Sequence, residues 1–474
     1  MRKSNRVYLT IIFLFVSISF TMPGTLQAGK VSFKGLAKKI NLFLEKTYPA
    51  NEPGAAVLAM IDGKIILRKG YGMANLELGI PIKPEMVFRI GSITKQFTAV
   101  AIMKLVEQGK LSVTDDITKY LKDYPTHGHK ITIHHLLNHT SGIKSYTNVK
   151  KMWSLMRKDM TVKELIDFFK TQPMDFAPGE RYLYNNSGYV LLGAIIEKVS
   201  GKSYETYIDE NIFKPLGMNS SYYGSSTRII PLRASGYKKE KNEFKNADYL
   251  SMTLPYAAGS LLSTVDDLHR WYQALEAGKV LSQKSLEQMY TPTKLNNGKT
   301  QNYGYGWSLG TSFGEKTIEH GGGINGFTTD ALRVPEKKVF VTVLTNFPQR
   351  QATAGYVSKW IAAVLCGKEL KEKKTVTLDT KILDAIVGVY KISEDEQRTV
   401  IREGDQLFTQ RSQGPKLPAF AESETEFFYK NSFSHFTIVK DKNGKVIKMI
   451  MHSDGGDEEA IKISDKPPTE KKEK

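Results

Sequence analysis

Cysteine is almost absent from this chain of 474 residues, which contains only Cys366. One thiol cannot form a disulfide within the chain, so the fold depends on its hydrophobic core. No apolar run reaches the roughly 20 residues that a membrane-spanning helix needs. Hydrophobic residues make up 41% and charged residues 24%, the balance of a globular protein. The length favours two or three folded units.

Negative charge is also in short supply. The chain has 49 acidic residues against 67 lysines and arginines, a formal net charge of +18. Nucleic-acid binding proteins gather such residues on an arginine-rich helix or a basic strand with interleaved aromatics, whereas the lysines here are scattered. The sequence therefore predicts no nucleic-acid partner, and the charge favours solubility or a loose attraction to an acidic cell envelope.

The first 28 residues have the pattern of a signal peptide. Arg2, Lys3 and Arg6 precede an apolar stretch at 7–20, and a short polar exit ends at Ala28. The apolar stretch has 14 residues, fewer than a bilayer requires. We expect cleavage near Ala28 and export to the periplasm or the extracellular space. An uncleaved membrane anchor is the alternative.

Residues 29–367 have the pattern of one α+β domain. Asp62-Gly63 joins two short apolar runs and is a strong hairpin signal. Gly91-Ser92 opens a helix that Gly109 ends, and short helices and loops continue to about residue 254. Further segments are predicted as helices at 33–48, 265–277, 282–290 and 352–365 and as strands at 55–61, 64–68 and between 304 and 346. Strands at both ends with helices between them predict a sheet that closes across a long sequence separation.

A second, smaller unit follows. Residues 368–380 are charged and poor in apolar side chains, as in a linker. Residues 381–464 alternate in short runs separated by turn signals, which predicts a small all-β barrel or sandwich. Its aromatic residues are either core or the lining of a ligand cavity. Residues 465–474 form a charged tail that we expect to be disordered.

The sharpest chemical motif is Ser92-Ile93-Thr94-Lys95. Serine is a weak nucleophile at neutral pH and needs a base beside it. A spacing of three at the start of a helix places both side chains on one face, and free N–H groups at the helix start can hold an oxyanion. Lysine serves as a base only if its pKa is lowered. By itself the motif also fits a capping serine and a solvated lysine.

Three further motifs follow this one along the chain. They are the stretch 133–142, which ends in His139-Thr140-Ser141-Gly142, then Tyr184-Asn185-Asn186, and then His320-Gly321-Gly322-Gly323. Over residues 33–365 the chain resembles the serine β-lactamases and penicillin-binding D,D-peptidases, in the branch nearer class C. This resemblance implies an antiparallel sheet flanked by helices with a helical subdomain. The second unit resembles the small lipocalin-like β-domain of some relatives.

The resemblance also implies roles for the motif residues. Ser92 would be the acylated nucleophile, Lys95 its proton acceptor and Tyr184 the phenol that passes a proton to the leaving group. Asn186 would contact Lys95 and the substrate. His320 and Gly322 match the strand motif, and the N–H groups of Gly323 and Ser92 would form the oxyanion hole. The family's chemistry requires no cofactor and no metal.

One departure from the family bears on the substrate. His320 stands where β-lactamases carry a lysine that helps to bind the substrate carboxylate, and histidine is mostly neutral at pH 7. We therefore expect a D-amino-acid peptidase, carboxypeptidase or esterase, acting on a small molecule or a peptide that includes cell-wall peptide. A β-lactamase and a non-catalytic envelope-binding protein are the alternatives. The oligomeric state stays open.

A cluster of histidines raises the question of a metal. His135 and His139 have the i, i+4 spacing of zinc ligands on a helix, within a group of five histidines at 127, 129, 134, 135 and 139. No acidic or cysteine ligand accompanies them, and in the family this stretch is scaffold. We expect no metal site.

Overall fold

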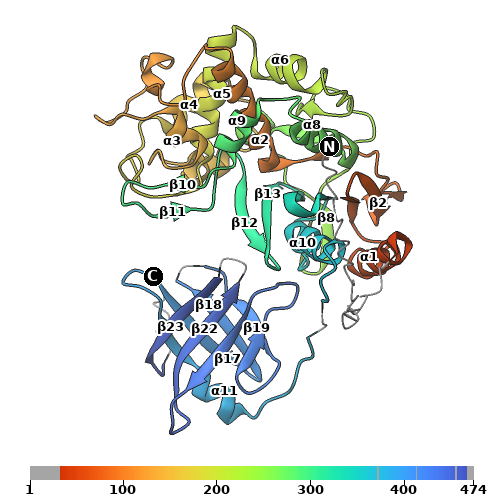
Figure 1. Cartoon of the computed structure of the whole chain (residues 1–474), viewed down its shortest axis with the longest axis vertical. Helices are drawn as coiled ribbons and strands as arrows, with labels where there is room; N and C mark the ends of the chain where they lie inside the picture. The colour runs from red at the N-terminus through yellow and green to blue at the C-terminus, as the bar shows by residue number, and fades with distance from the viewer. Residues whose placement is uncertain (1–31, 371–372, 413, 454–455, 467–474) are drawn as a thin grey trace, which may run out of the picture.

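The computed structural model describes residues 32–370, 373–412, 414–453 and 456–466. The predicted leader lies outside these residues, as does most of the predicted tail. Figure 1 shows two bodies, a larger one from the N-terminal part of the chain and a barrel from the C-terminal part. No helix within the described residues is long and apolar enough to cross a membrane.

The larger body is built on a six-stranded antiparallel sheet in the order β12-β13-β14-β15-β1-β2. Its strands are β1 (Ala55–Ile61), β2 (Lys64–Tyr71), β12 (Ser308–Ser312), β13 (Glu315–Ile324), β14 (Phe327–Val334) and β15 (Val339–Thr345). The first and last strands meet where Ala55 pairs with Thr345. This confirms the predicted closure across the sequence. Both β1 and β15 are apolar and almost wholly buried, because helices cover both faces of the sheet.

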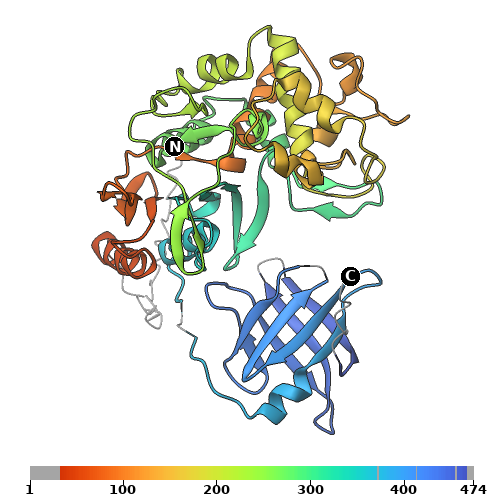
Figure 2. The same cartoon turned by 180° about the vertical axis from the view of Figure 1, so that it is seen from behind.

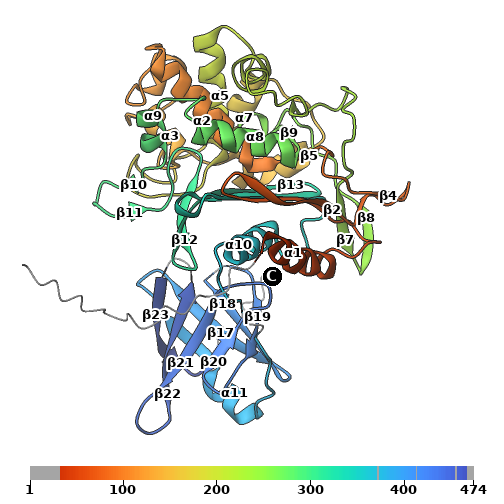
Figure 3. The same cartoon turned by 45° about the vertical axis from the view of Figure 1, so that its right-hand side comes forward.

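The two faces carry different helices (Figure 3). On one face lie α1 (Phe33–Thr47) and α10 (Ala354–Leu365). On the other lie α2 (Thr94–Glu107), α8 (Val265–Glu276) and the helical region. The remaining helices on that side are α3 (Ile133–Leu137), α4 (Val162–Phe169), α5 (Asn186–Ser200), α6 (Tyr204–Ile208), α7 (Tyr256–Gly259) and α9 (Gln283–Met289). Helix α2 is buried on nearly every side, so it is the central helix of this half.

The smaller body is a closed barrel of eight antiparallel strands. They are β16 (Gly388–Lys391), β17 (Gln397–Glu403), β18 (Gln406–Arg411), β19 (Leu417–Ala421), β20 (Glu426–Phe428), β21 (His435–Lys440), β22 (Val446–Ser453) and β23 (Gly456–Ser464). Phe427 and Phe436 stack at 5.1 Å within its core. Helix α11 (Thr380–Ile386) precedes β16 and contributes Leu383 and Ile386 to that core. This helix was not predicted, because its seven residues follow directly on the charged linker.

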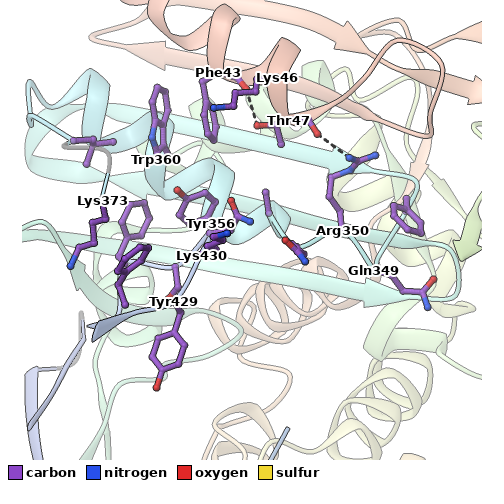
Figure 4. A pocket seen from close by; sticks show the side chains of 18 of the residues that line it. Phe43, Lys46, Thr47, Gln349, Arg350, Tyr356, Trp360, Lys373, Tyr429 and Lys430 are labelled. Carbon is purple, nitrogen blue, oxygen red and sulfur yellow. Dashed lines mark hydrogen bonds between the residues drawn. The ribbon is translucent and has the colours of Figure 1, made fainter. Parts of the chain in front are cut away.

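Phe433 joins the barrel to the larger body. Its ring stacks on Tyr356 of α10 at 4.8 Å and meets the edge of Phe313 at 4.6 Å. The barrel therefore lies on the α1 and α10 side of the sheet, at the end of a long connecting segment (Figure 2). Between the bodies is a cleft of about 1790 Å³, lined by aromatic and basic side chains that include Trp360 and Lys430 (Figure 4).

Candidate active site

Ser92 lies in a single 3-10 turn, Gly91–Ile93, directly before α2. Ile90 donates its N–H to the Leu261 carbonyl of β9 (Leu261–Ser263) at 3.0 Å, which fixes the entry to the turn. Gly91 has φ +52°, a left-handed conformation that glycine adopts without strain. Ser92 is therefore held half-buried at the start of the central helix.

The glycines of β13 let this strand run against the Ser92 turn. A Cβ on Gly322 would lie 2.0 Å from the Ile90 carbonyl oxygen, so any larger residue would push the strand away. A Cβ on Gly323 would meet nothing within 4 Å, and Gly323 lines the same cavity as Ser92. Gly323 thus borders open space in the cavity that Ser92 also lines.

Lys95 makes three polar contacts through its Nζ atom. These reach the Oγ of Ser92 at 3.2 Å, the Oδ1 of Asn186 at 2.8 Å and the carbonyl of Ala258 at 2.8 Å. The amide and backbone oxygens can only accept. A neutral amine has two hydrogens and one lone pair, so its hydrogens satisfy those two oxygens while the lone pair faces the Ser92 hydroxyl.

The surroundings of Lys95 favour this neutral form. The side chain is fully buried, and the rings of Tyr184 and Tyr189 lie 4.8 and 5.4 Å from Nζ. Burial holds the pKa of Lys95 well below its usual 10.5. No carboxylate of the described residues forms an ion pair with it, so nothing offsets the loss of water around the charge.

The 139–147 segment contacts the loop that carries Tyr184 and the first residue of α5, Asn186. His139 and Ser145 are two of its contact points: the His139 carbonyl accepts the Leu183 N–H at 3.0 Å, and the Ser145 hydroxyl accepts the Asn186 N–H at 3.2 Å. Asn185 is buried and caps α5 by accepting the Gly188 N–H at 2.8 Å. Hydrogen bonds from the 139–147 segment therefore hold the Tyr184-Asn185-Asn186 motif in place.

Tyr184 completes the group around Ser92. Burial raises the pKa of its phenol, and its proximity to the Ser92 hydroxyl opposes that rise. The hydroxyl makes no hydrogen bond of ordinary geometry among the described residues. The structure thus brings Ser92, Lys95, Tyr184 and Asn186 together, with Gly322 and Gly323 alongside.

Comparison with known proteins identifies the family. A family model described as Beta-lactamase matches residues 44–365. The chain belongs to this family.

Individual relatives agree with that assignment. Penicillin-binding protein 4* of Bacillus subtilis (strain 168) is 30% identical over 453 residues, covering 90% of this chain and 98% of its own. The octameric penicillin-binding protein homologue from Pyrococcus abyssi is 31% identical with a TM-score of 0.65, covering 90% and 98%. A D-stereospecific amidohydrolase from Streptomyces sp. is 27% identical with a TM-score of 0.59, covering 71% and 99%. The family resemblance, the fold class and the assignment as a serine hydrolase are therefore confirmed.

His320 lies in β13, and the resemblance places it where β-lactamases carry a lysine. Its Nδ1 lies 2.6 Å from the Gly321 carbonyl, which can only accept, so Nδ1 bears the proton. Its Nε2 then accepts from the Tyr303 hydroxyl at 2.9 Å. Burial, reinforced by Lys95, lowers the pKa of His320 to about 3. His320 is a neutral ring that packs beside Tyr184, at 6.1 Å between ring centroids.

The cavity at Ser92 has a volume of about 170 Å³. Its wall is mainly apolar, formed by Met152, Trp153, Met156, Leu250, Leu254, Pro255 and Ile324, and its polar side chains are Ser92, Tyr146, Thr147, Asn186 and Asn325. No acidic or basic side chain of the described residues lines it. This wall could not be predicted from the sequence, because its residues come from separate segments that no motif marks, including a 3-10 helix at Lys150–Leu155 and the end of β13.

The histidines that lie close together in the sequence do not form a single group of ligands in the structure. His135 lies in α3, where its Nδ1 accepts the Thr132 N–H at 3.2 Å, whereas His139 lies beyond the end of that helix and turns toward Tyr184. Among the described residues no three histidine, cysteine or acidic side chains gather as metal ligands do. Tyr303, Tyr189 and Ala258 are further parts of the site that the sequence did not reveal.

Proposed function

We propose that this β-lactamase-family protein hydrolyses amides, peptides or esters of apolar D-amino acids through an acyl-enzyme on Ser92. The observation that carries the proposal is the buried Lys95 amine at 3.2 Å from the Ser92 Oγ. With its two hydrogens engaged elsewhere, the amine can accept the serine proton as Oγ attacks a carbonyl carbon. The intact set of Ser92, Lys95 and Tyr184 supports catalysis rather than binding alone.

The later steps use the neighbouring groups. The N–H groups of Ser92 and Gly323 would hold the oxyanion, and the Tyr184 phenol would relay a proton to the departing amine or alcohol. The leaving group then departs and a water molecule hydrolyses the ester on Ser92. Asn186 would orient the Lys95 amine and the substrate amide.

The lining of the cavity supports this substrate class. Its wall offers apolar surface to the side chain of the acyl residue and no cation for a free carboxylate. His320 supplies none either, because its pKa is lowered to about 3. The similarity to a D-stereospecific amidohydrolase supports the choice of D-residues. Cell-wall peptide is a source of such substrates, and export through the leader at 1–28 would place the enzyme beside it.

A substrate panel tests this proposal. We expect D-phenylalanine amide and a D-phenylalanyl ester to be hydrolysed with a kcat/KM at least about tenfold above their L-forms and above a peptide ending in D-Ala-D-Ala with a free carboxylate. Equal rates for D- and L-forms would contradict the stereochemical assignment. Efficient hydrolysis of nitrocefin would favour the β-lactamase alternative. N-terminal sequencing of the protein from the cell envelope would reveal Gly29 or a neighbour if the leader is cleaved, and Met1 if it is retained.

A further inference from the structure

His139 contacts the chain on both sides of Tyr184. Its carbonyl accepts the N–H of Leu183 at 3.0 Å, and its ring Nδ1 accepts the N–H of Asn185 at 3.1 Å. A backbone N–H can only donate, so Nδ1 is unprotonated and the ring proton lies on Nε2. One residue thus clamps the backbone immediately before and after the phenol.

The ring of His139 also supports the Tyr184 ring. The two centroids lie 4.4 Å apart, and the imidazole is fully buried with Tyr303 at 4.7 Å on another side. His139 has φ +63°, a left-handed conformation that is uncommon for residues other than glycine but that histidine, asparagine and aspartate adopt more often than the rest. In this conformation His139 presents its carbonyl and its ring to the same neighbouring segment.

We propose that His139 is a positioning residue that fixes the Tyr184 phenol beside Ser92. It forms no hydrogen bond with Ser92 or Lys95, so it acts through Tyr184 rather than on the substrate. The proposal rests on the proposed function, in which the phenol relays a proton. It gives the buried histidine of the 133–142 stretch a task other than metal binding.

The experiment compares His139→Ala and His139→Asn in the wild-type and Tyr184→Phe backgrounds. The readouts are kcat and KM for a substrate that the wild type hydrolyses, with thermal unfolding measured for each variant. In the wild-type background, His139→Ala should lower kcat by about 10- to 100-fold, with KM changed by less than about threefold, because the phenol loses its alignment. His139→Asn should recover part of that loss, since asparagine tolerates the left-handed backbone and its Oδ1 can accept the Asn185 N–H.

The Tyr184→Phe background distinguishes a positioning role for His139 from a role in stabilising the fold. There the His139→Ala change should cost less than about threefold in kcat, because the hydroxyl that it positions is already gone. His135→Ala is the matched control: its ring nitrogen also accepts a backbone N–H, from Thr132, but away from the site. It should lower the melting temperature and leave kcat unchanged.

An equal loss of kcat in both backgrounds would overturn the proposal, as would full activity of His139→Ala. If His139→Ala does not fold, His139→Asn carries the same comparison. The proposed function has a separate failure: turnover that survives Ser92→Ala would contradict the acyl-enzyme itself, whatever His139 does.

Discussion

The Nζ atom of Lys95 lies 3.2 Å from the Oγ of Ser92, and the lysine side chain has no exposed surface. These two facts belong together. An exposed lysine would be charged at neutral pH and could not accept a proton, whereas a buried one without a carboxylate partner is driven to the neutral form. The fold obtains its base by enclosing an ordinary lysine among aromatic rings.

The pH dependence of turnover tests this view of Lys95. Since only the neutral amine accepts a proton, activity should be low in acid and rise as the pH passes the pKa of Lys95 in the free enzyme. Burial lowers that pKa from 10.5, so kcat/KM for an uncharged ester should reach its plateau well below pH 10. A profile that still rises tenfold per pH unit near pH 10 would mean that Lys95 keeps an ordinary pKa.

Much of the fold could be predicted from the sequence because its signals are local. Asp62-Gly63 marks the hairpin between β1 and β2, and Gly109 follows the end of α2, whose first residue, Thr94, comes two positions after the predicted start at Ser92. Helix α11 escaped prediction because it has only seven residues and follows directly on the charged linker, although Leu383 and Ile386 have helical spacing.

The active site also has parts that local sequence signals predict and parts that they do not. Ser92 and Lys95 share one helix start, so their spacing predicts their contact. Tyr303 contacts His320 across a loop and a strand, and nothing in the sequence around either residue marks that pairing. The apolar wall around Trp153 likewise depends on loop shape, which comes from long-range packing.

Tyr184→Phe removes the phenol hydroxyl and keeps the ring that packs against Lys95 and His139. Because general acid–base help is worth about 10²- to 10⁴-fold, kcat should fall by a factor in that range while the melting temperature changes little. Steady-state kinetics and thermal unfolding of the same preparation measure both. Unchanged kcat would show that another group protonates the leaving group.

Stability should depend on pH through the buried histidines. His320 has a pKa of about 3 in the folded protein and His135 one of about 4, against about 6.5 in an unfolded chain. Below pH 6.5 the unfolded state binds more protons, so stability should decrease as the pH falls from 6.5 toward 3. Denaturant unfolding across this range should show a weaker decrease for His320→Gln. An identical slope in both proteins would contradict the neutral His320.

The barrel should be held in place mainly by Phe433. Phe433→Ala removes the ring that stacks on Tyr356 and meets Phe313, so the barrel should move away from the larger body and the linker should become more accessible to protease. Small-angle scattering should report a larger radius of gyration. Turnover should not change, because the contact lies on the face of the sheet opposite to α2. Barrel core residue Phe427 gives a control, since Phe427→Ala should unfold the barrel instead.

An acyl-enzyme requires a covalent bond to Ser92, and mass spectrometry of the trapped enzyme detects that bond. The protein is treated with a fluorophosphonate and, in parallel, with a fluorescent penicillin, then digested and sequenced by mass. A fluorophosphonate adduct on the peptide that contains Ser92, absent in Ser92→Ala and strongly reduced in Lys95→Ala, is the predicted result. Labelling of a different serine, or equal labelling of Ser92→Ala, would contradict the account.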